Sequence, residues 1–182
     1  SAAVLAAIMF GAAAFPAAQE TTRGETNLRV WRALERLPYY GVFDFLAYRI
    51  DKGTVTLAGY AYRGNLKTDA YTAVKRIGGV DEVADQVQLL PASQNDDRIR
   101  WATFYNIYTD DFLSRYAPGG AMAARYELLQ VARFPGMQPF GNYPIHIVVK
   151  NGRTTLVGLV DNESDRMLAG VRARDVSGVF SV

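Results

Sequence analysis

The side chains that could support catalysis or metal binding are few and form no recognisable pattern. His146 is the only histidine, and the chain has no cysteine, so neither a multi-histidine zinc site nor thiol catalysis is expected. The carboxylate pair Asp96-Asp97 is interpreted as a helix cap, and Asp110-Asp111 as the polar face of an aromatic helix. No glycine-rich phosphate loop, nucleophile elbow or HExxH motif occurs. We therefore expect no enzyme, and no catalytic, cofactor-binding or metal-binding residues.

Two groups of residues are better suited to binding than to catalysis. In the first, Tyr60 and Tyr62 lie close in sequence to the cations of Arg63 and Lys67. Tyrosines beside cations suit a phospholipid headgroup interface or a protein partner. The alternative interpretation is the ordinary solvated rim of a folded unit.

The second group lies in the stretch of about 113–143, which contains a helical pattern over 120–134 and the loop GMQPFGNYP. Long insertions in compact domains are often functional. The stretch is more apolar than a loop requires, so its apolar residues either complete a core or contact a partner. They are Met122, Leu128, Leu129, Phe134, Met137, Phe140 and Tyr143.

Composition narrows the class of protein. Hydrophobic residues make up 49% of the chain and charged residues 21%, as in an ordinary globular protein. Twenty basic residues nearly balance eighteen acidic ones, and no basic block occurs. Nucleic acid is therefore not expected as a partner.

Residues 1–18 carry no charged side chain and have the composition of a secretory apolar region followed by small residues. The alternative is a retained membrane anchor, because eighteen helical residues span about 27 Å, close to the thickness of a hydrocarbon core. Both interpretations predict an exported protein of the periplasm or cell envelope. Residues 19–25 are expected to form a linker.

One stretch occurs twice. Gly53–Gly59 (GTVTLAG) is followed by a helical pattern and Gly79-Val80, and Gly152–Gly158 (GRTTLVG) is followed by a helical pattern and Gly178-Val179. The spacing between the copies is the same at every matched position. Such a gapless match indicates two copies of one structural unit.

Each copy predicts a helix, two strands, a helix and a third strand, an α+β layer with helices on one face of a small sheet. In the first unit (26–91) we expect helices over 28–37 and 65–77 and strands over 42–50, 54–58 and 83–89. In the second unit (95–182) an aromatic stripe from Trp101 to Phe112 indicates a core helix. The insertion, strands over 145–150 and 154–160 and a helix over 164–175 follow. The chain stops where the last strand would begin.

The repeat resembles the BON (bacterial OsmY and nodulation) domain family. The shared pattern is a strand and turn, Gly-x-Val/Thr-Thr-Leu-x-Gly, a helix, and Gly-Val-x-x-Val. The resemblance covers about residues 26–90 and 96–182, and departs from the family in the long insertion and the last strand. It implies a tandem, non-catalytic binding protein linked to anionic phospholipid, envelope integrity and osmotic stress.

Two functional hypotheses remain open. The first is a non-catalytic envelope-associated module that attaches to phospholipid headgroups or cell-wall polymer and supports envelope integrity. The alternative is a membrane-anchored structural or accessory subunit of a larger membrane or extracellular assembly, docked through the insertion 113–143. Charge reversal at Lys67 or Arg63 is expected to weaken the first activity, and deletion of 118–143 the second.

Overall fold

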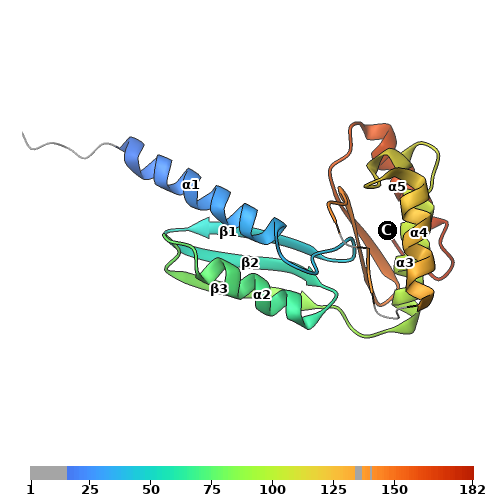
Figure 1. Cartoon of the computed structure of the whole chain (residues 1–182), viewed down its shortest axis with the longest axis horizontal. Coiled ribbons are helices and arrows are strands. Elements are labelled where there is room, and N and C mark those ends of the chain that lie inside the picture. Colours follow the sequence, from blue (N-terminus) through green and yellow to red (C-terminus); the bar gives the residue numbers. More distant parts are fainter. Residues whose placement is uncertain (1–15, 134–136, 140) are drawn as a thin grey trace, which may run out of the picture.

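The computed structural model describes residues 16–133, 137–139 and 141–182 as two α+β units (Figure 1). Unit 1 comprises α1 (Pro16–Glu35), β1 (Phe45–Asp51), β2 (Thr54–Ala61), α2 (Gly64–Lys75) and β3 (Glu82–Leu89). Unit 2 comprises α3 (Gln94–Tyr108), the 3-10 helix η1 (Leu113–Tyr116), α4 (Gly120–Arg133), β4 (Ile145–Lys150), β5 (Arg153–Gly158) and α5 (Glu163–Arg174). The α+β class and the helical insertion expected from the sequence are confirmed.

Unit 1 is a three-stranded sheet in the order β1-β2-β3 with α1 and α2 on one face (Figure 1). Strand β1 pairs with β2 in antiparallel register, and β3 adds to β2 in parallel, with Val55 opposite Val83. The helical period of α2 places Leu66, Ala70 and Val74 on its buried face. These side chains pack with the alternate residues of the sheet into one core.

Helix α1 corrects one expectation at the start of the chain. It begins at Pro16 and therefore includes 19–25, which was predicted to be a linker. Glutamine, glutamate and arginine, which make up four of these seven residues, are good helix formers, and proline is favoured at the first helical position, so the polar composition did not mark a loop. Most of the expected signal or anchor segment, residues 1–15, lies outside the described residues. Within the described ranges, no helix combines the length and apolarity needed to cross a membrane.

Unit 2 places α3, α4 and α5 on one face of the antiparallel β4–β5 hairpin (Figure 1). Its core joins the inward side chains of β4 to the aromatic stripe, in which Phe104 and Tyr108 are buried. Tyr105 and Phe112, expected in the core, are exposed. The last strand begins where the repeat places it, because Ser181 bridges Arg153 in parallel.

Helix α3 begins at a different cap from the one predicted. Ser93 is the N-cap residue, and its hydroxyl accepts the Asp96 N–H. The buried carboxylate of Asp96 instead accepts the N–H groups of Asn151 and Gly152 at 2.8 and 2.9 Å. It holds the β4–β5 turn against the start of α3, a long-range contact that local capping rules do not include.

Val42 and Phe43 were predicted to open the first strand, but β1 begins at Phe45. Both side chains are buried in the core of unit 2. The Val42 N–H donates to the Pro139 carbonyl at 3.1 Å, and the Val42 carbonyl accepts the Ile147 N–H at 2.8 Å. An apolar run shows that a segment is buried but does not show in which core, so the two residues were assigned to the wrong unit.

Candidate functional site

The two units are joined by a buried polar clamp at Asp44. Its carboxylate accepts N–H groups from Gly41 at 3.0 Å, from Tyr62 at 2.6 Å and from the Gln138 side chain at 2.6 Å. Burial raises the pKa of Asp44 to about 6, against the lowering effect of these three hydrogen bonds. The Gln138 amide oxygen also accepts the Phe43 N–H at 3.1 Å. The clamp therefore ties the insertion of unit 2 to the loop that enters β1.

Phe43 occupies the apolar side of this junction. Its ring lies edge-on to Trp101 at 5.1 Å, to Tyr62 at 5.8 Å and to Phe104 at 6.4 Å between centroids. Edge-to-face pairs of this kind add to the free energy of simple burial. Side chains of both units thus share one aromatic cluster.

Two of the predicted headgroup-binding residues, Tyr62 and Lys67, are held by structural contacts. Tyr62 packs in the aromatic cluster, with the buried Arg100 guanidinium 5.0 Å from its ring centroid. The Lys67 ammonium lies 3.5 Å from the Asp85 carboxylate and donates to the Val87 carbonyl at 2.6 Å, so it clamps α2 to β3. Arg63 is half-buried at the N-cap of α2. The structure thus does not gather the Tyr62 ring and the Arg63 and Lys67 cations into one open surface.

The predicted residues of the insertion loop are also divided. Tyr143 is buried, with its ring 5.6 Å from Phe104 and 4.9 Å from Tyr108, so it completes the core of unit 2. Met137 is half-buried, and Phe140 lies outside the described residues. Tyr143 therefore agrees with the interpretation that the apolar residues of this stretch complete a core.

Helix α4 carries an apolar stripe on its outer face. Met122, Tyr126 and Leu129 are 73%, 61% and 66% exposed, and their spacing of four and three residues places them on one side of the helix. Ala124 on the other side is buried. Met122 and Leu129 had been singled out from the sequence, whereas Tyr126 was missed although the helical period would have added it.

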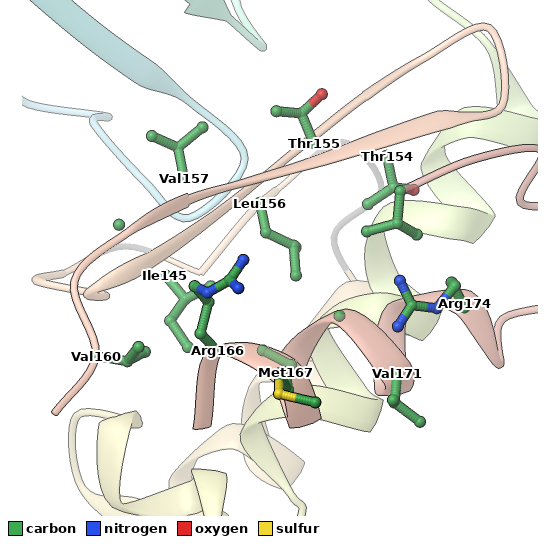
Figure 2. Close-up of a pocket in the computed structure, with 14 residues that line it drawn as sticks. Ile145, Thr154, Thr155, Leu156, Val157, Val160, Arg166, Met167, Val171 and Arg174 are labelled. Atoms are coloured by element: carbon green, nitrogen blue, oxygen red, sulfur yellow. The ribbon is translucent and has the colours of Figure 1, made fainter. Parts of the chain in front are cut away.

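A groove of about 560 Å³ lies between β5 and α5 (Figure 2). Leu156 points from the strand toward the helix, where Met167 and Val171 line the opposite wall (Figure 2). In unit 1 the corresponding edge of β2 is covered by β3, whose Val83 and Val87 are buried against α2. The groove therefore lies along the edge of β5 at which Ser181 begins to pair. It occupies the position that β3 fills in unit 1.

Across the described residues no group of three or more histidines, aspartates or glutamates could hold a metal ion. His146 lies on the face of β4 toward unit 1, stacked on Tyr40 at 5.3 Å. Burial lowers its pKa. The surroundings of His146 are those of a packed junction, formed by the Tyr40 and Phe45 rings and the backbone of Gly41 and Asp44.

A sequence model of the BON domain matches residues 43–91 and 132–182. The chain therefore belongs to the BON domain family, with one match in each unit. BON domains are generally non-catalytic binding domains, and they occur in periplasmic and envelope proteins. The two matched ranges leave out helices α1 and α3 and most of the insertion.

Two solved structures are similar to the whole chain at low identity. One is CdsD, a structural protein of the Type III secretion system of Chlamydia trachomatis, with 13% identity and a TM-score of 0.30 over 87% of this chain and 89% of that one. The C-terminal domain of CdsD gives 13% identity and a TM-score of 0.28 over 85% and 92%. No curated protein matches the chain.

Proposed function

We propose that this BON protein is a non-catalytic module that attaches to an anionic phospholipid surface of the cell envelope. The observation that carries the proposal is the exposed stripe of Met122, Tyr126 and Leu129 on α4. A helix that lies in the plane of a membrane interface presents such an apolar stripe to the lipid, and α4 is held in place by its opposite side, where Ala124 packs in the unit 2 core. Tyrosine is suited to the headgroup level because its ring is apolar and its hydroxyl is polar.

The charges on α4 fit the same orientation. Arg125 is exposed beside the stripe, whereas Glu127 lies on the other side of the helix and is half-buried. Burial raises the pKa of Glu127. A cation near an anionic membrane surface adds about 1 kcal/mol to binding, so Arg125 favours anionic over neutral lipid.

The expected attachment is weak and reversible. Full burial of one large apolar side chain is worth roughly 1.5–3 kcal/mol. Three side chains that are about two-thirds exposed therefore contribute on the order of 3–6 kcal/mol, before the cost of losing translational and rotational freedom. Strong attachment would need a second signal in the same chain.

Co-sedimentation of the full chain with lipid vesicles tests the proposal. Vesicles of phosphatidylglycerol and phosphatidylethanolamine are expected to bind the chain, and phosphatidylcholine vesicles to bind it less. The double variant Met122→Gln/Leu129→Gln should reduce binding to the anionic vesicles about tenfold or more. The apolar residues 1–18 are common to both proteins, so the difference reports α4 alone.

Leu159→Gln is the matched control, because Leu159 is 83% exposed but lies outside α4 in the loop between β5 and α5. It should bind as the unaltered chain does. Equal binding by the α4 variant and the Leu159 variant would refute the role of the stripe.

The alternative function, an accessory subunit of a larger assembly, uses the same face of the insertion. An apolar stripe at helical spacing also fits a groove on a protein partner. A photo-crosslinking residue at position 126, used in native membranes, separates the two. Lipid adducts support the phospholipid proposal, and a discrete protein adduct of constant mass supports the accessory subunit.

A further inference from the structure

The β4–β5 turn of unit 2 carries an exposed aromatic ring that is held in a fixed position. The Phe180 N–H donates to the Gly152 carbonyl at 2.9 Å. Gly152 has a φ of +73°, and a Cβ added to it would lie only 2.6 Å from the Phe180 ring. The ring therefore rests on the bare backbone of the turn, yet it is 81% exposed. Such a ring is an ordered apolar platform that faces solvent.

Unit 1 has the same backbone arrangement with different chemistry. At the position that corresponds to Phe180, the Asp81 N–H donates to the Gly53 carbonyl at 2.9 Å, and a carboxylate covers the glycine. The turn of unit 1 also contains Asp51, at the position of Lys150 in unit 2. The repeat therefore keeps the turn and removes both carboxylates from the unit 2 copy.

Lys150 stands where unit 1 has Asp51, Phe180 where it has Asp81, and Arg153 where it has Thr54. Lys150 and Arg153 flank the unit 2 turn, and among the described residues neither forms an ion pair with a carboxylate. The Lys150 ammonium donates to the Gln88 side-chain oxygen at 2.9 Å. The nearby Asp96 carboxylate is buried and accepts backbone N–H groups of the turn. Two cations therefore remain available to an anion.

These groups line one cavity at the junction of the units. It measures about 560 Å³, within the range of small-molecule sites. Unit 1 contributes Tyr60, whose ring centroid lies 5.8 Å from the Lys150 ammonium. Unit 2 contributes the Phe180 ring, the two cations and the polar side chains of Asn151 and Thr155. Two aromatic rings from different units thus border a site with cations and hydrogen-bonding groups.

We propose that this cavity binds an anionic sugar unit of a polysaccharide. The C–H faces of a sugar ring pack on aromatic rings, here Phe180 and Tyr60. A carboxylate substituent pairs with Lys150 and Arg153, and hydroxyl groups bond to Asn151 and Thr155. Lys150 of the cavity lies on the face of β4 opposite to Ile147 and Val149, which point into the unit 2 core. The helices of unit 2, α4 included, lie on the core side of the hairpin (Figure 1). A membrane bound through α4 therefore leaves the cavity open to a polymer on the other side, which goes beyond the lipid attachment proposed above.

The test compares two disaccharides that differ by one lactyl ether group, which carries a carboxylate. Titration calorimetry of the full chain with N-acetylglucosaminyl-N-acetylmuramic acid is expected to show binding. Diacetylchitobiose, which lacks the carboxylate, should bind at least tenfold more weakly. Arg153→Glu should weaken binding of the anionic sugar more than tenfold, and Phe180→Ala about three- to tenfold. Both side chains are exposed, so neither change removes core contacts.

Lys52→Glu is the matched control, because it reverses an exposed charge at the corresponding turn of unit 1. It should leave sugar binding unchanged. Equal affinity for the two disaccharides, no binding of either, or equal effects of Lys52→Glu and Arg153→Glu would each overturn the proposal. None of these results depends on vesicle binding, so the sugar site and the lipid surface can fail separately.

Discussion

Units 1 and 2 share one repeat but close their cores in different ways. The core of unit 1 is built from α1, α2 and three paired strands, with side chains from unit 1 alone. The core of unit 2 contains Val42 and Phe43, which come from the loop before β1. It also surrounds buried polar groups such as Arg100 and Gln138. Unit 1 therefore has a self-contained core, whereas unit 2 is completed by a segment of unit 1.

This difference shows how two copies of a duplicated domain can be joined through a shared core. Two repeats joined by a linker move independently by default, unless the interface between them is large and apolar. Here the connection is a shared aromatic cluster and a buried carboxylate at Asp44. The orientation of the units matters for the proposed sugar site, because Tyr60 reaches it from unit 1.

The largest effect on the difference between the two cores is expected from Phe43→Ala. Phe43 is fully buried, and removing a buried phenylalanine side chain costs about 3–5 kcal/mol. The loss should fall on unit 2 although the residue precedes β1. Urea unfolding of a Trp31→Phe background, in which Trp101 of unit 2 is the only tryptophan, should show the transition at a lower urea concentration.

Phe112→Ala provides the control for Phe43→Ala, because it makes the same truncation at a side chain that is 66% exposed. A small effect is expected there. If the two variants unfold alike, or if Phe43→Ala destabilises only unit 1, the shared core does not hold unit 2 together.

A smaller effect is expected from Gln138→Leu. The change keeps the approximate volume but removes the donor to Asp44 and the acceptor of the Phe43 N–H. The Phe43 N–H left without a partner costs about 1–3 kcal/mol, and the Asp44 carboxylate, which keeps the Gly41 and Tyr62 N–H groups, loses one hydrogen bond worth about 1.5 kcal/mol or more, so a loss of about 2–4 kcal/mol is expected. Unfolding monitored through Trp101 measures it. Gln88→Leu, at an exposed glutamine of β3, should cost less than 1 kcal/mol, and equal losses would contradict the clamp.

The third effect depends on pH. The pKa of Asp44 rises from 3.8 to about 6 because the group is buried, so between these values the native state binds more protons than the unfolded state. The free energy of unfolding should therefore fall by about 2–3 kcal/mol as the pH rises from about 4 to about 6. Asp44→Asn should remove this slope, and the exposed Asp51→Asn should keep it. A wild-type slope that survives in Asp44→Asn would assign it to another group.

The sequence predicted the repeated elements well and the contacts between units poorly. The buried positions Leu66, Ala70 and Val74 of α2 follow from helical spacing alone, and they are correct. The sequence also shows that Asp96 is a hydrogen-bond acceptor and that Phe43 is apolar. It does not show their partners, which are distant in the chain. The same limit applies to the candidate sites. Helical period indicates the α4 stripe, whereas the cavity beside Phe180 requires a three-dimensional comparison of the two turns.

The smallest expected effect also depends on pH, but here the stability falls as the pH is lowered. Burial lowers the pKa of His146, partly offset by the backbone of Gly41 and Asp44. The native state therefore binds fewer protons than the unfolded state below about pH 6.5, and stability should decline as the pH falls through that value. His146→Phe keeps an aromatic ring against Tyr40 and removes the titration. The free energy of unfolding is measured against pH for both proteins, and the difference between them should isolate this decline. A difference that stays constant between pH 7.5 and pH 5 would show that His146 is not held neutral by the packing of unit 1 on β4.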